Sequence, residues 1–97
     1  MEPNYFVYIM TNKSNRVLYC GVTNNLYRRV KEHRLGIGSK FTAKYHVKKT
    51  VYYQIFESIY DALDNEKRLK GGSRQRKIDL IEEFNPDWKD LFIELNS

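Results

Sequence analysis

Three ionisable residues occupy positions that helical spacing assigns to the apolar sides of two predicted helices. Arg29 and His33 share the spacing of the apolar residues in segment 26–33, so both flank an apolar contact. Glu66 falls at the 3, 4, 3 spacing of the apolar stripe in segment 59–69. Because a buried charge is costly unless it meets a cation, a metal or several donors, these three positions are candidates for a functional site.

Phosphodiester hydrolysis is the chemistry that such a set would suit. The reaction needs an activated water, positive charge at the phosphoryl oxygens and help for the leaving oxygen. Glu66 could hold one Mg²⁺ or Mn²⁺, because hard cations prefer carboxylate oxygen and keep several waters. Arg29 could grip the phosphate with its planar fork, and His33 could relay a proton or contact phosphate. Each of the three, taken singly, is more often a structural residue at a helix edge.

Tyr8 and Tyr19 are the candidates for the general base. A tyrosine has an unperturbed pKa of about 10, so a nearby arginine or metal would have to favour its phenolate. Segments 4–11 and 16–22 are rich in Tyr, Val, Ile and Phe and predict two antiparallel strands around the polar connection "NKSN". If those residues form the loop, positions 8 and 19 pair directly and share one face of the sheet. The pattern does not choose between the two tyrosines, and simple sheet packing would also explain the pair.

The remaining elements follow the order ββαβαα. A first helix is expected over about residues 24–35, a basic loop over 36–46, a third strand over 48–58, and two further helices over 59–70 and 74–84. The residues expected to cap or end these helices are Thr23 and Asn24, Gly36, Ser58 with Asp61, Gly71 and Gly72, Ser73, and Asn85 with Pro86. This order predicts the α+β class, with helices packed on a small sheet.

Length and composition limit the remaining choices. The 97 residues, 41% of them hydrophobic, fit a single domain over residues 1–97. No signal-peptide pattern follows the first residues, and no apolar run approaches the roughly 20 residues of a membrane span. The single cysteine, Cys20, is interpreted as a small buried hydrophobe and fits a reducing compartment. We therefore expect a soluble cytoplasmic protein without a membrane partner.

Basic residues are concentrated in a few segments and indicate a polyanionic partner. The formal net charge is +5, and the excess falls in "YRRVKEHR", "KFTAKYHVKK" and "EKRLKGGSRQRK". Basic groups on one face would attract phosphates and release counterions, although a solvated surface explains the same charge. Gly21 would let a phosphate or the neighbouring helix approach closely. The candidate substrate contacts are Gly21, Arg28, Lys40, Lys44 and Arg74.

These residues resemble the GIY-YIG nuclease superfamily, in particular its small single-domain prokaryotic branch. The name motif is present as "FVY" at 6–8 and "YCG" at 19–21, followed by "NLYRR", "GSKFTAKY", "NEKRLK" and "LKGGSRQRKIDLI". Phe6 stands where the family has glycine and Cys20 where it has isoleucine. The resemblance implies a three-stranded antiparallel sheet flanked by helices, one divalent metal, and hydrolysis of a DNA phosphodiester. It assigns Tyr8 and Tyr19 as motif tyrosines, Gly21 as the motif glycine, Arg29 as catalytic, His33 at a position often held by His or Tyr, Glu66 as metal ligand, and Asn85 as a structural asparagine.

Three functions remain open from the sequence. The first is a metal-dependent DNA endonuclease, including one selective for DNA structures in repair or recombination. The second is a non-catalytic nucleic-acid-binding module or partner-recruited subunit, which Glu66 disfavours because a carboxylate repels phosphate unless a metal intervenes. The third is a protein-interaction domain that uses Trp88 and Phe92 in the tail "NPDWKDLFIEL". A protein partner could supply specificity, and the sequence does not indicate the oligomeric state.

Overall fold

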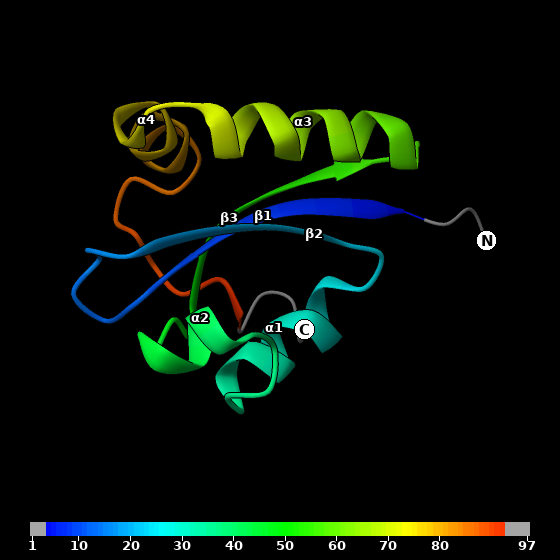
Figure 1. Ribbon diagram of the computed structural model, residues 1–97. Coiled ribbons are helices and arrows are strands. Elements are labelled where there is room, and N and C mark those ends of the chain that lie inside the picture. Colours follow the sequence, from blue (N-terminus) through cyan, green and yellow to red (C-terminus); the bar gives the residue numbers. More distant parts are fainter. Residues whose placement is uncertain (1–3, 93–97) are drawn as a thin grey trace.

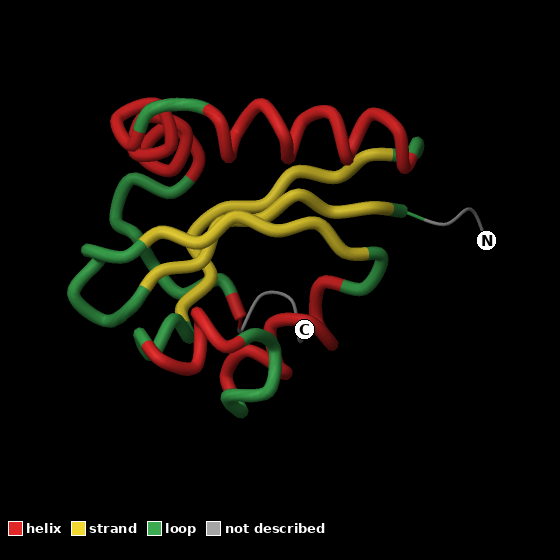
Figure 2. Tube along the Cα trace, viewed as in Figure 1, coloured by secondary structure: helices red, strands yellow, loops and turns green. Residues whose placement is uncertain are grey.

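Helices cover both faces of a small antiparallel sheet in the computed structural model, which describes residues 4–92 (Figure 1). The strands lie in the order β2-β1-β3. In the tube view the sheet forms a middle layer, with α3 and α4 on one side and α1 and α2 on the other (Figure 2). The elements are β1 Tyr5–Thr11, β2 Leu18–Thr23, α1 Leu26–Arg34, α2 Lys40–Lys44, β3 Lys49–Phe56, α3 Ile59–Gly71 and α4 Arg74–Phe84. The α+β class with a three-stranded antiparallel sheet is confirmed.

The central strand β1 supplies side chains to two separate cores. Val7 and Ile9 point toward α3 and α4 and join one buried apolar cluster. Tyr8 and Met10 point the opposite way and join the second cluster, with residues of α1. Both faces of β1 are therefore buried, and alternate residues of this strand belong to different layers.

The hairpin register differs from the predicted one by two residues. Tyr8 pairs with Gly21 and Tyr19 with Met10, so the prediction that positions 8 and 19 pair directly is wrong. The loop is longer than "NKSN" because Asn12 Oδ1 accepts from the backbone amides of Arg16 (2.9 Å) and Val17 (3.1 Å), which keeps both residues out of the ladder. A shift of two preserves the face, and the two tyrosine rings still lie 6.3 Å apart.

The segment predicted to be a basic loop contains a helix, α2, so the element order is ββααβαα. Ser39 caps this helix by accepting from the backbone amide of Thr42 at 3.1 Å. The helix has only 5 residues, too few for a periodic apolar pattern to reveal.

The other helices begin and end close to the predicted residues. The cap of α1 is Asn25, one residue beyond the predicted Thr23 and Asn24. Ser58 and Ser73 cap α3 and α4 as predicted, and Gly72 ends α3. Within residues 4–92, no helix is long and apolar enough to cross a membrane.

Asn85 links the segment after α4 to strand β3 by hydrogen bonds. Its buried amide donates to the carbonyl oxygens of Val51 (3.1 Å) and Lys89 (2.8 Å), and its Oδ1 accepts from the Lys89 amide. The Phe92 ring stacks on Tyr27 at a centroid distance of 5.4 Å. The two aromatic residues of the predicted interaction segment thus pack on the domain, Trp88 beside the α3 and α4 cluster and Phe92 beside α1; residues 93–95 of that segment lie outside the described residues.

Candidate active site

Tyr8 of β1 is buried and pairs with Gly21 on the neighbouring strand β2. Only 1% of Tyr8 is exposed, and its phenol occupies the space that a side chain at position 21 would fill. A Cβ built on Gly21 would lie 2.5 Å from Tyr8 Cζ, well inside van der Waals contact. The motif glycine thus gives room to the Tyr8 phenol, whereas the sequence had suggested room for a phosphate or a helix.

His33 on α1 is the hydrogen-bond partner of Tyr8. The Tyr8 hydroxyl lies 3.0 Å from His33 Nε2, and His33 Nδ1 lies 2.9 Å from Thr42 Oγ1. Thr42 Oγ1 itself donates to the carbonyl oxygen of Ser39 at 3.2 Å. We therefore assign the proton to Nδ1, which donates to Thr42, so that Nε2 accepts from Tyr8.

Burial keeps this histidine neutral. Burial, together with the nearby Arg29 charge, lowers the pKa of His33 to about 4. Gly38 makes the close packing possible, because a Cβ there would lie 2.8 Å from two atoms of the His33 ring. His33 therefore joins α1 to the short helix α2 through a neutral, fully buried imidazole.

Sequence reasoning missed the residues that hold His33 in place. Thr42, Ser39 and Gly38 lie in the segment interpreted as a loop. The available signal was Ser39, a helix-capping residue type directly before "KFTAK".

Arg29 lies beside both tyrosines at the edge of this network. Burial raises the pKa of Tyr8 well above its ordinary range, and the neighbouring Arg29 guanidinium opposes this only in part. Burial lowers the pKa of Arg29, but hydrogen bonding to Tyr8 and Glu32 and the charges of Tyr8 and Tyr19 raise it by more. Arg29 NH1 pairs with Glu32 at 3.2 Å, with the guanidinium partly open to solvent.

Tyr19 is the more accessible of the two tyrosines. Its half-buried ring packs between His33, 5.2 Å away in an edge contact, and Phe41 of α2, 6.0 Å away in a stacked contact. Tyr8, Tyr19, Arg29 and His33 are thus brought together on the α1 side of the sheet.

Glu66 reaches the same region from α3, on the other side of the sheet. Its negative charge contributes to the raised pKa values of Tyr8 and of Cys20, although burial is the largest cause in each case. Its carboxylate Oε2 pairs with Lys70 Nζ at 3.4 Å, and 17% of the side chain is exposed. The structure thus groups four of the five predicted residues on the α1 side of the sheet, and the charge of Glu66 acts on Tyr8 from the α3 side.

The single carboxylate fits a metal that keeps most of its waters. Among residues 4–92, no group of three or more His, Cys, Asp or Glu side chains is placed to hold a metal. Mg²⁺ commonly takes one or two carboxylates and completes its shell with water and substrate phosphates. Glu66 is partly accessible, and its pairing with Lys70 shows that it already attracts a cation.

The predicted substrate contacts are more scattered. Arg28, Lys40 and Lys44 are exposed on α1 and α2, with the Lys44 ammonium 5.3 Å from the Tyr45 ring centroid. Arg74 is exposed at the start of α4, where it donates to the carbonyl oxygen of Asn15 at 3.5 Å. The structure thus groups the two lysines on α2 and places Arg74 against the hairpin loop.

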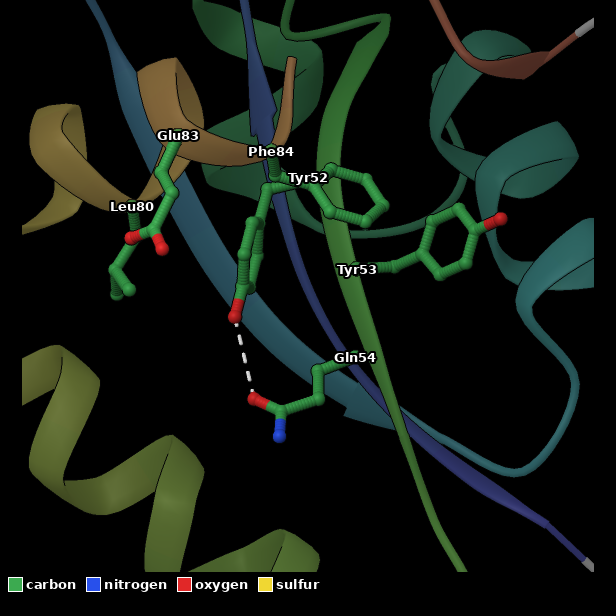
Figure 3. Close-up of a pocket in the computed structure, with 6 residues that line it drawn as sticks. All are labelled: Tyr52, Tyr53, Gln54, Leu80, Glu83 and Phe84. Carbon is green, nitrogen blue, oxygen red and sulfur yellow. Dashed lines mark hydrogen bonds between the residues drawn. The ribbon is translucent and has the colours of Figure 1, made fainter.

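A hollow of about 420 Å³ lies away from these residues, between β3 and α4 (Figure 3). Its lining residues are Tyr52, Tyr53, Gln54, Leu80, Glu83 and Phe84. The Tyr52 hydroxyl donates to Gln54 Oε1 at 3.2 Å across it. Glu83 is the charged residue of this lining, and a carboxylate repels phosphate, so the hollow does not suit a nucleic-acid substrate.

Known proteins are similar to this chain in sequence and in fold. The family model described as the GIY-YIG catalytic domain matches residues 4–79. A UPF0213 protein of Staphylococcus haemolyticus is 38% identical over 79 residues, which cover 81% of this chain and 95% of that relative. A UPF0213 protein of Clostridium perfringens is 40% identical over 76 residues, covering 78% of this chain and 81% of the relative.

A solved structure agrees in fold. The solution NMR structure of the UPF0213 protein BH0048 from Bacillus halodurans matches with a TM-score of 0.58 and 30% identity, covering 90% of this chain and 92% of the other. The resemblance noted in the sequence therefore holds over most of the chain. This chain belongs to the family of GIY-YIG catalytic domains, among the small prokaryotic UPF0213 proteins.

Proposed function

We propose that this protein is a metal-dependent endonuclease that hydrolyses phosphodiester bonds in DNA. The observation that carries the proposal is the convergence of two phenols, a guanidinium and a neutral imidazole on the α1 side of the sheet, with the charge of Glu66 acting on Tyr8 from α3. The family supports the same reaction class, because its model describes a catalytic domain.

Arg29 would bind the scissile phosphate. Its guanidinium is partly exposed, lies beside both phenols and is restrained by Glu32 at 3.2 Å. A planar fork donates to two phosphoryl oxygens at once and neutralises charge that develops in the transition state. Glu66 would hold Mg²⁺ or Mn²⁺, which supplies further positive charge at the phosphoryl oxygens.

Tyr19 would accept the proton of the attacking water. Tyr8 is less suited to this role, because its hydroxyl is buried, donates to His33 and has a raised pKa. Tyr19 is half-buried, and Arg29, which would bind the phosphate, lies beside it. The Tyr8 and His33 pair would then position Tyr19, through the ring contacts at 6.3 and 5.2 Å.

A non-catalytic DNA-binding module is the second candidate. The observation that favours it is the Lys70 to Glu66 ion pair, which offsets the negative charge of Glu66 without a metal. Such a module would bind DNA through its basic residues and leave the phosphodiester intact.

A comparison of the wild type with Glu66→Gln separates the two functions. Both proteins are incubated with plasmid and with branched, flapped and single-stranded DNA, in Mg²⁺, in Mn²⁺ and in EDTA. We expect metal-dependent cleavage by the wild type, loss of cleavage in Glu66→Gln, and binding retained in both. Glu82→Gln, at an exposed position of α4, is the matched control and should cleave normally. Binding without cleavage by every folded protein would overturn the nuclease and support the module.

A further inference from the structure

A pocket of about 300 Å³ runs along β2 and adjoins the proposed active site through Tyr19. β2 is an edge strand, and the pocket passes around this edge from α2 to α3 and α4, which lie on opposite sides of the sheet in Figure 1. Its volume is at the lower end of the range for sites that hold a small ligand. The lining residues are Leu18, Tyr19, Cys20, Phe41, Lys70 and Lys77.

Phe41 presents an aromatic ring at one side of this pocket. The residue is 43% exposed, although its ring stacks with Tyr19 at 6.0 Å and contacts Tyr45 at 4.9 Å. These two contacts hold the ring in place while part of it faces solvent. A fixed, exposed aromatic ring is the usual platform on which a protein stacks an unpaired base, without preference for base identity.

Two lysines supply positive charge at the opposite side. Lys77 Nζ donates to the carbonyl oxygen of Gly72 at 3.1 Å, and Lys70 Nζ lies 3.4 Å from Glu66. Burial raises the pKa of Cys20 to about 11, and the Lys77 and Lys70 charges oppose that rise. Both lysines line the pocket, and their charges act on Cys20 of its β2 side, while Glu66 pairs with Lys70.

We propose that this pocket binds one unpaired nucleotide of DNA next to the scissile phosphate. The base stacks on Phe41, and the adjoining phosphate lies between Lys70 and Lys77. This inference rests on the proposed function, since it takes Tyr19 and Glu66 as the place of cleavage.

The pocket also names the substrate class. In an intact duplex both faces of an internal base are covered by its neighbours, so stacking on Phe41 requires a nucleotide that has left the stack. We therefore expect preference for single-stranded, flapped or branched DNA over continuous duplex.

Binding in EDTA tests the pocket independently of cleavage. A fluorescein-labelled single strand, a 5′-flapped duplex and a blunt duplex of the same sequence are titrated, with anisotropy as readout. We expect the wild type to bind the first two more tightly than the blunt duplex. Phe41→Leu should lose about fivefold or more of that preference, which is the lower range for loss of one stacked base. Phe41→Tyr, which keeps the ring, should retain it.

Loss of the lysines should change the overall affinity and its salt dependence rather than the preference for unpaired DNA. Lys77→Gln and the double variant Lys70→Gln/Lys77→Gln should weaken binding and reduce the salt slope for single strands by about 0.7 for each phosphate that the variant no longer neutralises. Tyr60→Leu and Lys67→Gln, at exposed positions of α3 outside the pocket, are the matched controls and should behave as wild type.

The outcomes separate this inference from the nuclease itself. Equal affinity of the wild type for all three DNAs, or unchanged preference in folded Phe41→Leu, would overturn the pocket even if the protein cleaves DNA. The expected binding pattern without cleavage would support the pocket and count against the nuclease. Circular dichroism of each variant confirms that the fold is intact.

Discussion

The hydroxyl of Tyr8 lies 3.0 Å from Nε2 of His33 inside the fold, although the two residues are 25 positions apart in the chain. This bond joins the central strand to α1. The other ring nitrogen of His33, Nδ1, lies 2.9 Å from Thr42 Oγ1 and so links α1 to α2. The short helix α2, which carries Phe41, is therefore fastened to the sheet by a polar network as well as by apolar packing.

Loss of the Tyr8 hydroxyl should destabilise the protein. Tyr8→Phe leaves Nε2 of His33 buried without its donor, and we expect the free energy of unfolding to fall by about 1–3 kcal/mol. Urea denaturation followed by circular dichroism gives this value. Tyr60→Phe removes a hydroxyl from a side chain that is 81% exposed and should leave stability unchanged. Equal stability of Tyr8→Phe and wild type would contradict the buried hydrogen bond.

Stability should depend on pH through His33. The pKa of its imidazole is about 4 in the folded protein and close to 6.5 in the unfolded chain. Between these values the unfolded chain binds a proton that folded His33 does not, so stability falls as the pH falls from 6.5 to 4. The full loss is on the order of 3 kcal/mol.

The difference between wild type and His33→Gln isolates this contribution from the carboxylates, which titrate in the same window. The free energy of unfolding, measured by denaturation at several pH values, should fall less steeply with falling pH in His33→Gln than in the wild type. Parallel pH profiles of the two proteins would mean that folded His33 takes up its proton at the same pH as in the unfolded chain.

A methyl group at position 21 should be tolerated poorly. Gly21→Ala places a Cβ 2.5 Å from Tyr8 Cζ, and overpacking of this kind costs about 1–3 kcal/mol. Gly71→Ala is the matched control, because nothing lies within 4 Å of its Cβ and the position is helical. We expect this control to be stabilised by about 0.5–1 kcal/mol in thermal or urea denaturation. Opposite signs for the two variants would support the packing of Tyr8 over Gly21, and equal signs would contradict it.

The two tyrosines should differ in kinetics if the protein is a nuclease. Tyr19→Phe removes the proposed base and should lower kcat by about 10²-fold or more, with stability and DNA affinity retained. Tyr8→Phe should lower stability and cleavage together, because its effect passes through His33 and Tyr19. Single-turnover cleavage measured beside anisotropy separates the two cases, with Tyr45→Phe as control. If Tyr8→Phe is stably folded and loses more kcat than Tyr19→Phe, then Tyr8 is the base and Tyr19 is the positioning residue.

Patterns that repeat along the chain predicted most of these features. Helical spacing placed Arg29 and His33 beside the apolar side of α1, and strand alternation placed Tyr8 and Tyr19 on one face. Local capping chemistry gave the starts of α3 and α4 at Ser58 and Ser73. Each of these signals depends on residues near one another in sequence, which is why one chain was enough to reveal them.

The features that the sequence did not reveal depend on contacts without a repeating pattern. The hairpin register follows from side-chain bonds of Asn12 to the amides of Arg16 and Val17, which lengthen the loop. The helix α2 has too few residues for periodicity, and its link to His33 crosses 9 positions. Spacing also could not show that Tyr8 donates to His33, because that contact joins a strand to a separate helix.

Gly21 also selects one strand pairing among those that would satisfy the apolar pattern. In the pairing predicted from a four-residue loop, Tyr19 would stand opposite Tyr8 and every side chain would still face its present layer. That alternative hairpin would bury the same apolar residues, but the phenol of Tyr8 would face the side chain of Tyr19 instead of the space left by Gly21. The absence of a side chain at position 21 thus favours the observed register of the hairpin. Only with this glycine opposite Tyr8 does the phenol have room to reach His33.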